Sequence, residues 1–191
     1  MCRSTERGAA LALVVLAILI LTVVGIAVSY ASQTEDRISG NVRLARTAFY
    51  AAETGLRAGE VALGKAAAAG LDGLVRDPGG ASALQLPGGR TAFPLRLNGA
   101  TFLKMPVASR AGARDLVRFS VYVRNNDEDP GGAGADTDRI VDLVVLGEAF
   151  LSAAAGGPET VLSTSLLEEQ LVIPGGGGPF VPRPVWWKII R

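Results

Sequence analysis

The amino-acid sequence predicts an α+β protein in which one long N-terminal helix packs on a small antiparallel β-sheet. Residues 9–28 form a nearly unbroken apolar run, and at about 1.5 Å per residue this run spans the roughly 30 Å of hydrocarbon in a bilayer. Residues 38–63 continue with apolar or small residues at alternating spacings of four and three, which is typical of one helix face. Three later segments alternate in polarity and are joined by turn-forming residues, which favours an antiparallel meander.

The composition excludes several classes of function. The net charge is +1 without any basic block, so nothing indicates a nucleic-acid partner. The sequence has no histidine, and its single cysteine is Cys2. These absences exclude Cys/His metal sites, Ser-His-Asp triads and intrachain disulfides. An enzyme would have to work with carboxylates, lysine, serine or tyrosine only. We expect a non-enzymatic protein with no cofactor other than a candidate structural calcium ion.

The charges around the apolar run predict its orientation. Arg3 and Arg7 precede it, whereas Glu35 and Asp36 follow it, and this bias favours a cytoplasmic N-terminus. The alternative is a cleaved secretory signal with a small-residue cleavage site near Ala31. The apolar region of such a signal is normally about 7–15 residues long, and here the helical pattern continues past the cleavage site. We expect a single-pass inner-membrane helix whose following domain lies outside that membrane.

The helix is expected to continue beyond the membrane to about residue 68, because no proline occurs before Pro78. The spacing lays one seam of apolar or small side chains along it. The seam comprises Ile38, Val42, Ala45, Phe49, Ala52, Leu56, Gly59 and Leu63. Five glycines weaken the helix by up to about 1 kcal/mol each relative to alanine. They are Gly25, Gly40, Gly55, Gly59 and Gly64.

Residues 70–100 are rich in glycine and proline and are predicted to be mostly loop. The strands that follow from the alternating pattern are 117–124, 139–152 and 160–173, with shorter strands near 92–97 and 101–106. Glu168 and Glu169 are adjacent on one strand, so their side chains point to opposite faces and cannot easily share a site. We expect both to be exposed charges.

The polar loop after the first long strand is a candidate calcium site. Asn125, Asp127 and Asp129 alternate, and Asp136 occupies the twelfth position of the spacing that EF-hand loops use. Pro130 stands where an EF-hand needs glycine, so the loop is not an EF-hand. Asn, Asp and Gly are also ordinary turn formers, so a solvated hairpin loop is the alternative.

The C-terminal segment, residues 175–191, is a Gly/Pro hinge followed by an apolar peptide that contains Trp186 and Trp187. One interpretation is a last strand that packs on the protein's own sheet. The other is an arm that adds to a partner's sheet edge or fills its groove, with the tryptophans as partner contacts.

Three blocks resemble a known family in order along the chain: RGAALALVVLAILILTVVGIAV, TEDRISGN and ARTAFYAAETGLRAGE. Together they resemble the N-terminal region of PilX-type minor pilins of type IV pili, and they are also similar to K-type minor pseudopilins of type II secretion. The resemblance covers roughly residues 7–60. It implies a type IV pilin-like fold, in which the first half of the long helix spans the membrane or lies in the filament core.

The resemblance also implies a class III leader, residues 1–8, which a prepilin peptidase removes after Gly8. Ala9 then becomes the mature N-terminus and is N-methylated. Most pilins carry glutamate at the fifth mature position, where this sequence has Leu13, a departure that PilX-like proteins commonly share. The implied domains are the leader, the membrane half of the helix at 9–29, its amphipathic half at 30–68, a globular domain at 69–174 and the C-terminal segment at 175–191.

The function implied by the resemblance is to prime assembly of a type IV pilus and to sit near its tip, with adhesion and twitching motility as the processes served. The implied partners are other minor pilins, the major pilin, prepilin peptidase, the inner-membrane assembly platform and a PilY-type tip adhesin. One alternative is a minor pseudopilin of a type II secretion system. A second is a membrane-anchored envelope protein with no filament role.

Overall fold

The computed structural model describes residues 4–66, 72–75, 83–97, 100–107, 115–130, 136–152, 158–174 and 182–190. Within these ranges it contains the long helix α1 (Ser4–Ala66), the short helix α2 (Asp72–Val75) and nine β-strands. The chain divides into two compact units, Met1–Arg43 and Leu44–Arg191, and α1 contributes to both. The α+β layout with one long apolar helix and an antiparallel sheet confirms the predicted fold class.

The first unit is the N-terminal part of α1, whose side chains from Ala10 to Arg43 are exposed. α1 is the one helix in the described part of the chain that is long and apolar enough to cross a membrane, with a mean hydropathy of 3.2 in its most apolar window. Thr22 Oγ1 donates to the carbonyl of Ile18 at 2.8 Å. This bond satisfies a hydroxyl that lipid could not.

The second unit is built on an antiparallel sheet with the strand order β1-β2-β6-β7-β8-β9, in which β5 also pairs with β6. The three long strands β6, β7 and β8 form the predicted meander, and β9 adds a fourth strand beside β8. Two short strands, β3 and β4, pair separately. The bounds are β1 Leu84–Gln85, β2 Thr91–Pro94, β3 Arg96–Leu97, β4 Ala100–Thr101, β5 Met105–Pro106, β6 Asp115–Asn125, β7 Ile140–Ser152, β8 Glu159–Val172 and β9 Arg183–Ile190.

The sheet buries side chains on both faces, because successive residues of a strand point to opposite sides. Val121, Val145 and Leu167 are paired across β6, β7 and β8 and belong to the main core beneath α1. The residues that follow or precede them in sequence, such as Tyr122 and Val144, form a second, smaller core on the other face. The strands are therefore more apolar than those of a sheet with one solvent-exposed face.

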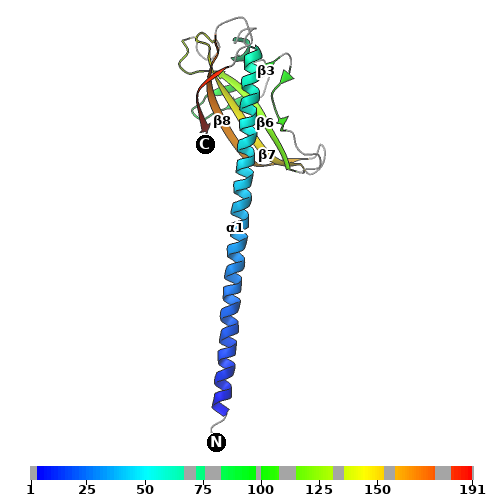
Figure 1. Cartoon of the computed structure of the whole chain (residues 1–191), viewed down its shortest axis with the longest axis vertical. Coiled ribbons are helices and arrows are strands. Elements are labelled where there is room, and N and C mark those ends of the chain that lie inside the picture. The colour runs from blue at the N-terminus through cyan, green and yellow to red at the C-terminus, as the bar shows by residue number, and fades with distance from the viewer. Residues whose placement is uncertain are drawn as a thin grey trace. The chain divides into compact units, whose positions relative to one another are not determined.

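The C-terminal part of α1 lies across β6, β7 and β8 (Figure 1). Its buried positions recur every three or four residues, so one helical face is covered. They are Ala48, Ala51, Ala52, Gly55, Leu56, Gly59, Ala62, Leu63 and Gly64. The predicted seam is therefore buried from Ala52 onward and partly buried at Phe49.

Glycines allow this close contact between helix and sheet. A Cβ on Gly55 would lie 2.5 Å from Val145 Cγ1, and a Cβ on Gly59 would lie 2.7 Å from Leu143 Cδ2. On the sheet side, a Cβ on Gly147 would meet the backbone of α1. Gly55 was predicted only as a weak point of the helix, and Gly59 also as a member of the seam. Both set the distance between helix and sheet, a role that Gly25 and Gly40 do not share because nothing lies within 4 Å of a Cβ added there.

The expectation that Glu168 and Glu169 are exposed is wrong, since their exposed fractions are 0% and 4%. They do point to opposite faces. Glu168 forms two ion pairs: its Oε2 lies 2.7 Å from Lys188 Nζ, and its Oε1 lies 3.0 Å from Arg90 Nη1. Glu169 faces α1. The alternation of polar and apolar residues did not predict the burial of Glu168, because it depends on β9, which pairs with the edge of β8 and supplies Lys188.

Arg124 joins this buried network near the end of β6, on the sheet's second face. Its Nη2 lies 2.6 Å from Asp142 Oδ2, and its Nε lies 3.4 Å from Glu168 Oε1. Asp127, just after the end of β6, accepts two hydrogen bonds from Arg124: Nη1 donates to Oδ1 at 2.7 Å and Nη2 to Oδ2 at 2.9 Å. Buried charges are tolerated only when paired in this way.

Candidate functional site

The residues predicted for leader cleavage lie in the helical backbone of α1, which begins at Ser4 and so includes Gly8 and Ala9. Leu13, at the position where most pilins have glutamate, is 67% exposed. Its neighbours along the helix are equally apolar. Cleavage after Gly8 and methylation of Ala9 stay predictions.

The predicted seam divides at the boundary between the two units. Ile38 is 58% exposed and Val42 is 45% exposed, and Ala45 is exposed as well. The later members, from Ala52 to Leu63, are buried against the sheet. The first half of the seam thus has no cover among the described residues, whereas the second half belongs to the protein's own core.

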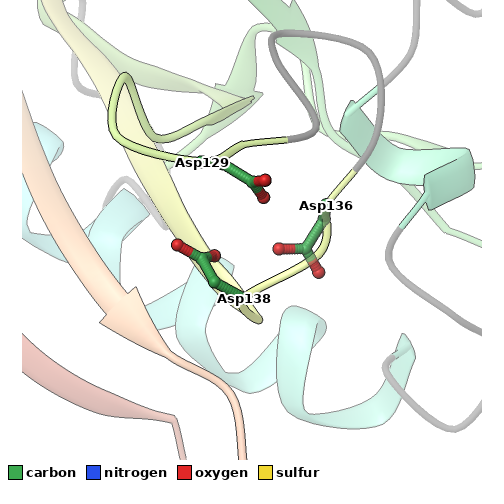
Figure 2. A group of neighbouring side chains, drawn as sticks. All are labelled: Asp129, Asp136 and Asp138. Carbon is green, nitrogen blue, oxygen red and sulfur yellow. The ribbon is translucent and has the colours of Figure 1, made fainter.

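Three carboxylates converge in the loop between β6 and β7. Asp129, Asp136 and Asp138 each place an oxygen within 4.8 Å of the others, and Figure 2 shows the three side chains turned toward one another. Asp129 and Asp136 were predicted, and Asp138 was missed although it lies only two residues from Asp136. Carboxylate oxygens from a loop are the ligands that Ca²⁺ prefers.

The other two predicted ligands lie elsewhere. Asp127 pairs with Arg124, and the side chain of Asn125 is buried at the end of β6. The three converging carboxylates also accept hydrogen bonds from the loop itself. Asp129 accepts from the amide of Thr137 at 2.7 Å, Asp136 from the amide of Arg139 at 2.9 Å, and Asp138 from Asn126 Nδ2 at 2.9 Å. Both interpretations, a calcium site and a self-bonded turn, stay open. Calcium stays a prediction, and calorimetric titration with CaCl₂ checks it.

The C-terminal tryptophans lie on β9, which pairs with β8 of the same sheet. Trp186 Nε1 donates to Gln170 Oε1 at 3.1 Å, and Lys188 Nζ lies 4.6 Å from the centre of the Trp186 ring. Trp187 points to the opposite face and remains 59% exposed. The segment is thus a last strand in this chain, and a partner contact through the tryptophans stays a prediction.

A small cavity of about 120 Å³ lies between α1 and the edge of the sheet formed by β8 and β9. Glu169 of β8 lines it and shares a hydrogen bond with Glu60 of α1. Burial, followed by the charge of Glu60, raises the pKa of Glu169 from 4.5 to about 7. Sequence reasoning missed this site because Glu60 and Glu169 are distant along the chain.

The raised pKa of Glu169 predicts a pH-dependent stability. The folded state holds the proton more tightly than the unfolded state, so the unfolding free energy falls as pH rises from about 4.5 to 7. The expected loss is at most about 3 kcal/mol. The charged groups facing Glu169 are Glu53, Arg57 and Glu60 of α1, while Trp187 of β9 is uncharged.

Urea unfolding of the wild type and of Glu169→Gln from pH 4.5 to 8.5 checks this prediction. We expect the variant to match the wild type near pH 4.5 and to exceed it in stability at pH 8. Parallel profiles for the two proteins over the whole range would contradict it.

A second cavity of about 510 Å³ opens beside β2 and the end of β6. The charged side chains in its wall are Arg90, Arg124 and Asp127, and all three form ion pairs. They are engaged in holding the sheet together, so no described residue there has the arrangement of a nucleophile with its base.

Comparison with known proteins gives one match. A family model described as PilX N-terminal matches residues 7–57. No curated protein and no solved structure matches the chain. The matched region includes the apolar half of α1 and the first turns that pack on the sheet, and it confirms the resemblance drawn from the three sequence blocks.

Proposed function

Because residues 7–57 match the PilX N-terminal family model, we propose that this chain is a minor pilin of a type IV pilus and that it primes pilus assembly. The observation that carries the proposal is the match over residues 7–57, on a helix that also docks a globular sheet domain. The pilin family is structural, and the buried charges of Arg124, Asp142 and Glu168 are engaged in ion pairs within the sheet. The protein then acts by assembling with other subunits.

The first step is maturation of the helix. Prepilin peptidase cuts after Gly8 on the cytoplasmic side, and Ala9 carries the new, N-methylated amine. Residues 10–28 of α1 expose apolar side chains on all sides. A helix that is apolar all round is suited first to lipid and then to a helical filament core.

The exposed half of the seam supplies contacts to neighbouring subunits. Ile38, Val42 and Ala45 belong to the same sequence seam as the residues from Ala52 to Leu63 that pack on the sheet. These three side chains are exposed in the isolated chain. Burying them against other pilin helices removes apolar surface from water at about 25 cal/mol per Å². The expected neighbours are other minor pilins and the major pilin.

Leu13 supports a position at or near the tip. A carboxylate in the membrane costs up to about 3 kcal/mol unless it is paired, and in most pilins the pairing group is the N-terminal amine of a neighbouring subunit. A subunit with Leu13 needs no such neighbour in the usual register. It can therefore start a filament, with the tip adhesin of PilY type as an expected partner.

Substitution of Leu13 tests this assignment. We expect Leu13→Glu to reduce the number of surface pili per cell at least several-fold at an unchanged membrane level, because the new carboxylate requires a partner. Leu13→Ile is the matched control and should leave pilus number unchanged. Equal piliation in the two strains would contradict the tip assignment.

Co-purification after crosslinking distinguishes the filament systems. A tagged chain should recover pilus minor pilins together with the large tip adhesin, and a deletion strain should lose most surface pili. Recovery of secretion pseudopilins would instead assign the chain to type II secretion. Recovery of neither set, with normal pili in the deletion strain, would reject a filament role.

A further inference from the structure

The cavity beside Glu169 contains a buried hydrogen-bond acceptor that has no donor. Glu169 is 4% exposed, and its Oε2 accepts no hydrogen bond from the residues that the structure describes. Its carboxyl group shares a hydrogen bond with Glu60, whose own partner is Arg57 Nη1 at 2.5 Å. A buried polar atom without a partner is costly and needs an explanation.

The charges around this atom favour a cation. Glu53, Glu60 and Glu169 face a single guanidinium, that of Arg57. The side chain of Arg57 is 70% exposed and is paired with Glu60. When all four groups are ionised, three carboxylates against one guanidinium leave the cavity with two excess negative charges. An anion is therefore repelled, and a neutral apolar group would leave Oε2 without a donor.

The walls of the cavity suit an alkyl cation. Leu56 of α1 and Leu167 of β8 supply apolar surface, and the exposed ring of Trp187 lies at the same cavity. Indole rings attract cations that approach their faces. Lys188, the next residue, points to the other face and is held by Glu168 and the Trp186 ring, so it does not supply the missing charge.

We propose that this cavity binds one ammonium or guanidinium group, donated by a lysine or arginine side chain of a neighbouring protein. The cation donates to Glu169 Oε2 and stacks against Trp187. The site is lined by residues of both α1 and the sheet edge, so a basic side chain of a partner protein would contact both elements at once. This inference uses only the cavity and holds whether or not the chain acts in a pilus.

Binding of n-butylammonium chloride to the full chain in a neutral detergent tests the proposal, with NMR shifts of the Trp187 indole as the readout. We expect saturable binding at pH 8, and binding weaker by about tenfold or more at pH 5.5, where Glu169 is mostly protonated. Neutral n-butanol should not saturate. Nα-acetyl-lysine methylamide should bind at least as well as butylammonium if a protein side chain is the natural source, and markedly weaker binding would indicate a free amine instead.

Matched variants separate the buried acceptor from general charge and from aromatic surface. We expect Glu169→Gln to weaken butylammonium binding about tenfold, whereas Glu53→Gln at the exposed rim changes it less than threefold. Trp187→Leu, for which the methyl shifts of Leu56 and Leu167 replace the indole as the readout, should weaken binding about threefold. Trp186→Leu, on the opposite face, should leave binding unchanged. The wild type at pH 5.5 provides a neutral Glu169 without any mutation. Equal binding by wild type and Glu169→Gln, or equal shifts from butanol and butylammonium, would overturn the proposal.

Discussion

Gly147→Ala is expected to destabilise the globular unit by about 3 kcal/mol or more. A Cβ at this position would meet the carbonyl oxygen of Ala48 and would lie 2.5 Å from the amide nitrogen of Ala52 and 2.9 Å from its Cβ. Two of these three atoms belong to the helix backbone, which cannot rotate away as a side chain can. α1 must therefore move off the sheet, which opens the core beneath Ala52 and Leu56.

Gly40→Ala is the matched control, because nothing lies within 4 Å of a Cβ there. It should leave the unfolding free energy unchanged or raise it by up to about 1 kcal/mol through helix propensity. Guanidinium unfolding followed by tryptophan fluorescence measures both variants. A loss below 1 kcal/mol for Gly147→Ala would mean that helix and sheet are not in close contact.

Arg124→Met is expected to destabilise the protein by about 3–5 kcal/mol, because it leaves the buried carboxylate of Asp142 without its ion-pair partner and removes one of the cations beside Glu168. The side chain of Asp142 is 2% exposed and that of Glu168 is fully buried. Burial already raises the pKa of Asp142, and Arg124 opposes that rise. Without Arg124 the carboxyl must take up a proton or draw in water, and either cost lowers stability.

Arg57→Met provides the comparison, since the side chain of Arg57 is 70% exposed and its ion pair with Glu60 should contribute less than about 1 kcal/mol. Combining Arg124→Met with Asp142→Leu should recover part of the loss, because the unpaired buried charge is then removed. Chemical unfolding at pH 7 compares the four proteins. If Arg124→Met costs no more than Arg57→Met, the network contributes little to the fold.

The long helix and the meander were predictable because each leaves a local, periodic signal. The seam from Ile38 to Leu63 and the lack of proline before Pro78 indicated a helix that ends near residue 68, and α1 ends at Ala66. The three long strands alternate or run apolar between turn-forming residues. Such patterns depend only on neighbours in sequence.

The buried charges were not predictable in this way. Glu168 is buried because Lys188 of β9 and Arg90, which directly precedes β2, reach it from 20 and 78 residues away along the chain. Glu169 is buried because α1 covers it and brings Glu60 to the same cavity. The strand pattern correctly predicted that these two side chains point to opposite faces of the sheet, but it contains no information on what covers each face.

A glycine in α1 either only lowers helix stability or also makes room for side chains of the sheet, and the sequence alone does not distinguish these two roles. Gly40 weakens α1 without any packing role in the structure, whereas Gly55 and Gly59 admit side chains of the sheet. A signal was present at Gly147, because a glycine inside an apolar strand often marks the close approach of another backbone. The alternating loop residues likewise pointed to Asp129 and Asp136 but not to their neighbour Asp138.

The most direct test of the central claim, that α1 is a pilin assembly helix, is the intact mass of the protein purified from cells with active prepilin peptidase. We predict a chain that begins at Ala9, lacks residues 1–8 and carries one additional methyl group. Cells without the peptidase should yield the chain from Met1 instead. A chain that still begins at Met1 when the peptidase is active would contradict the claim.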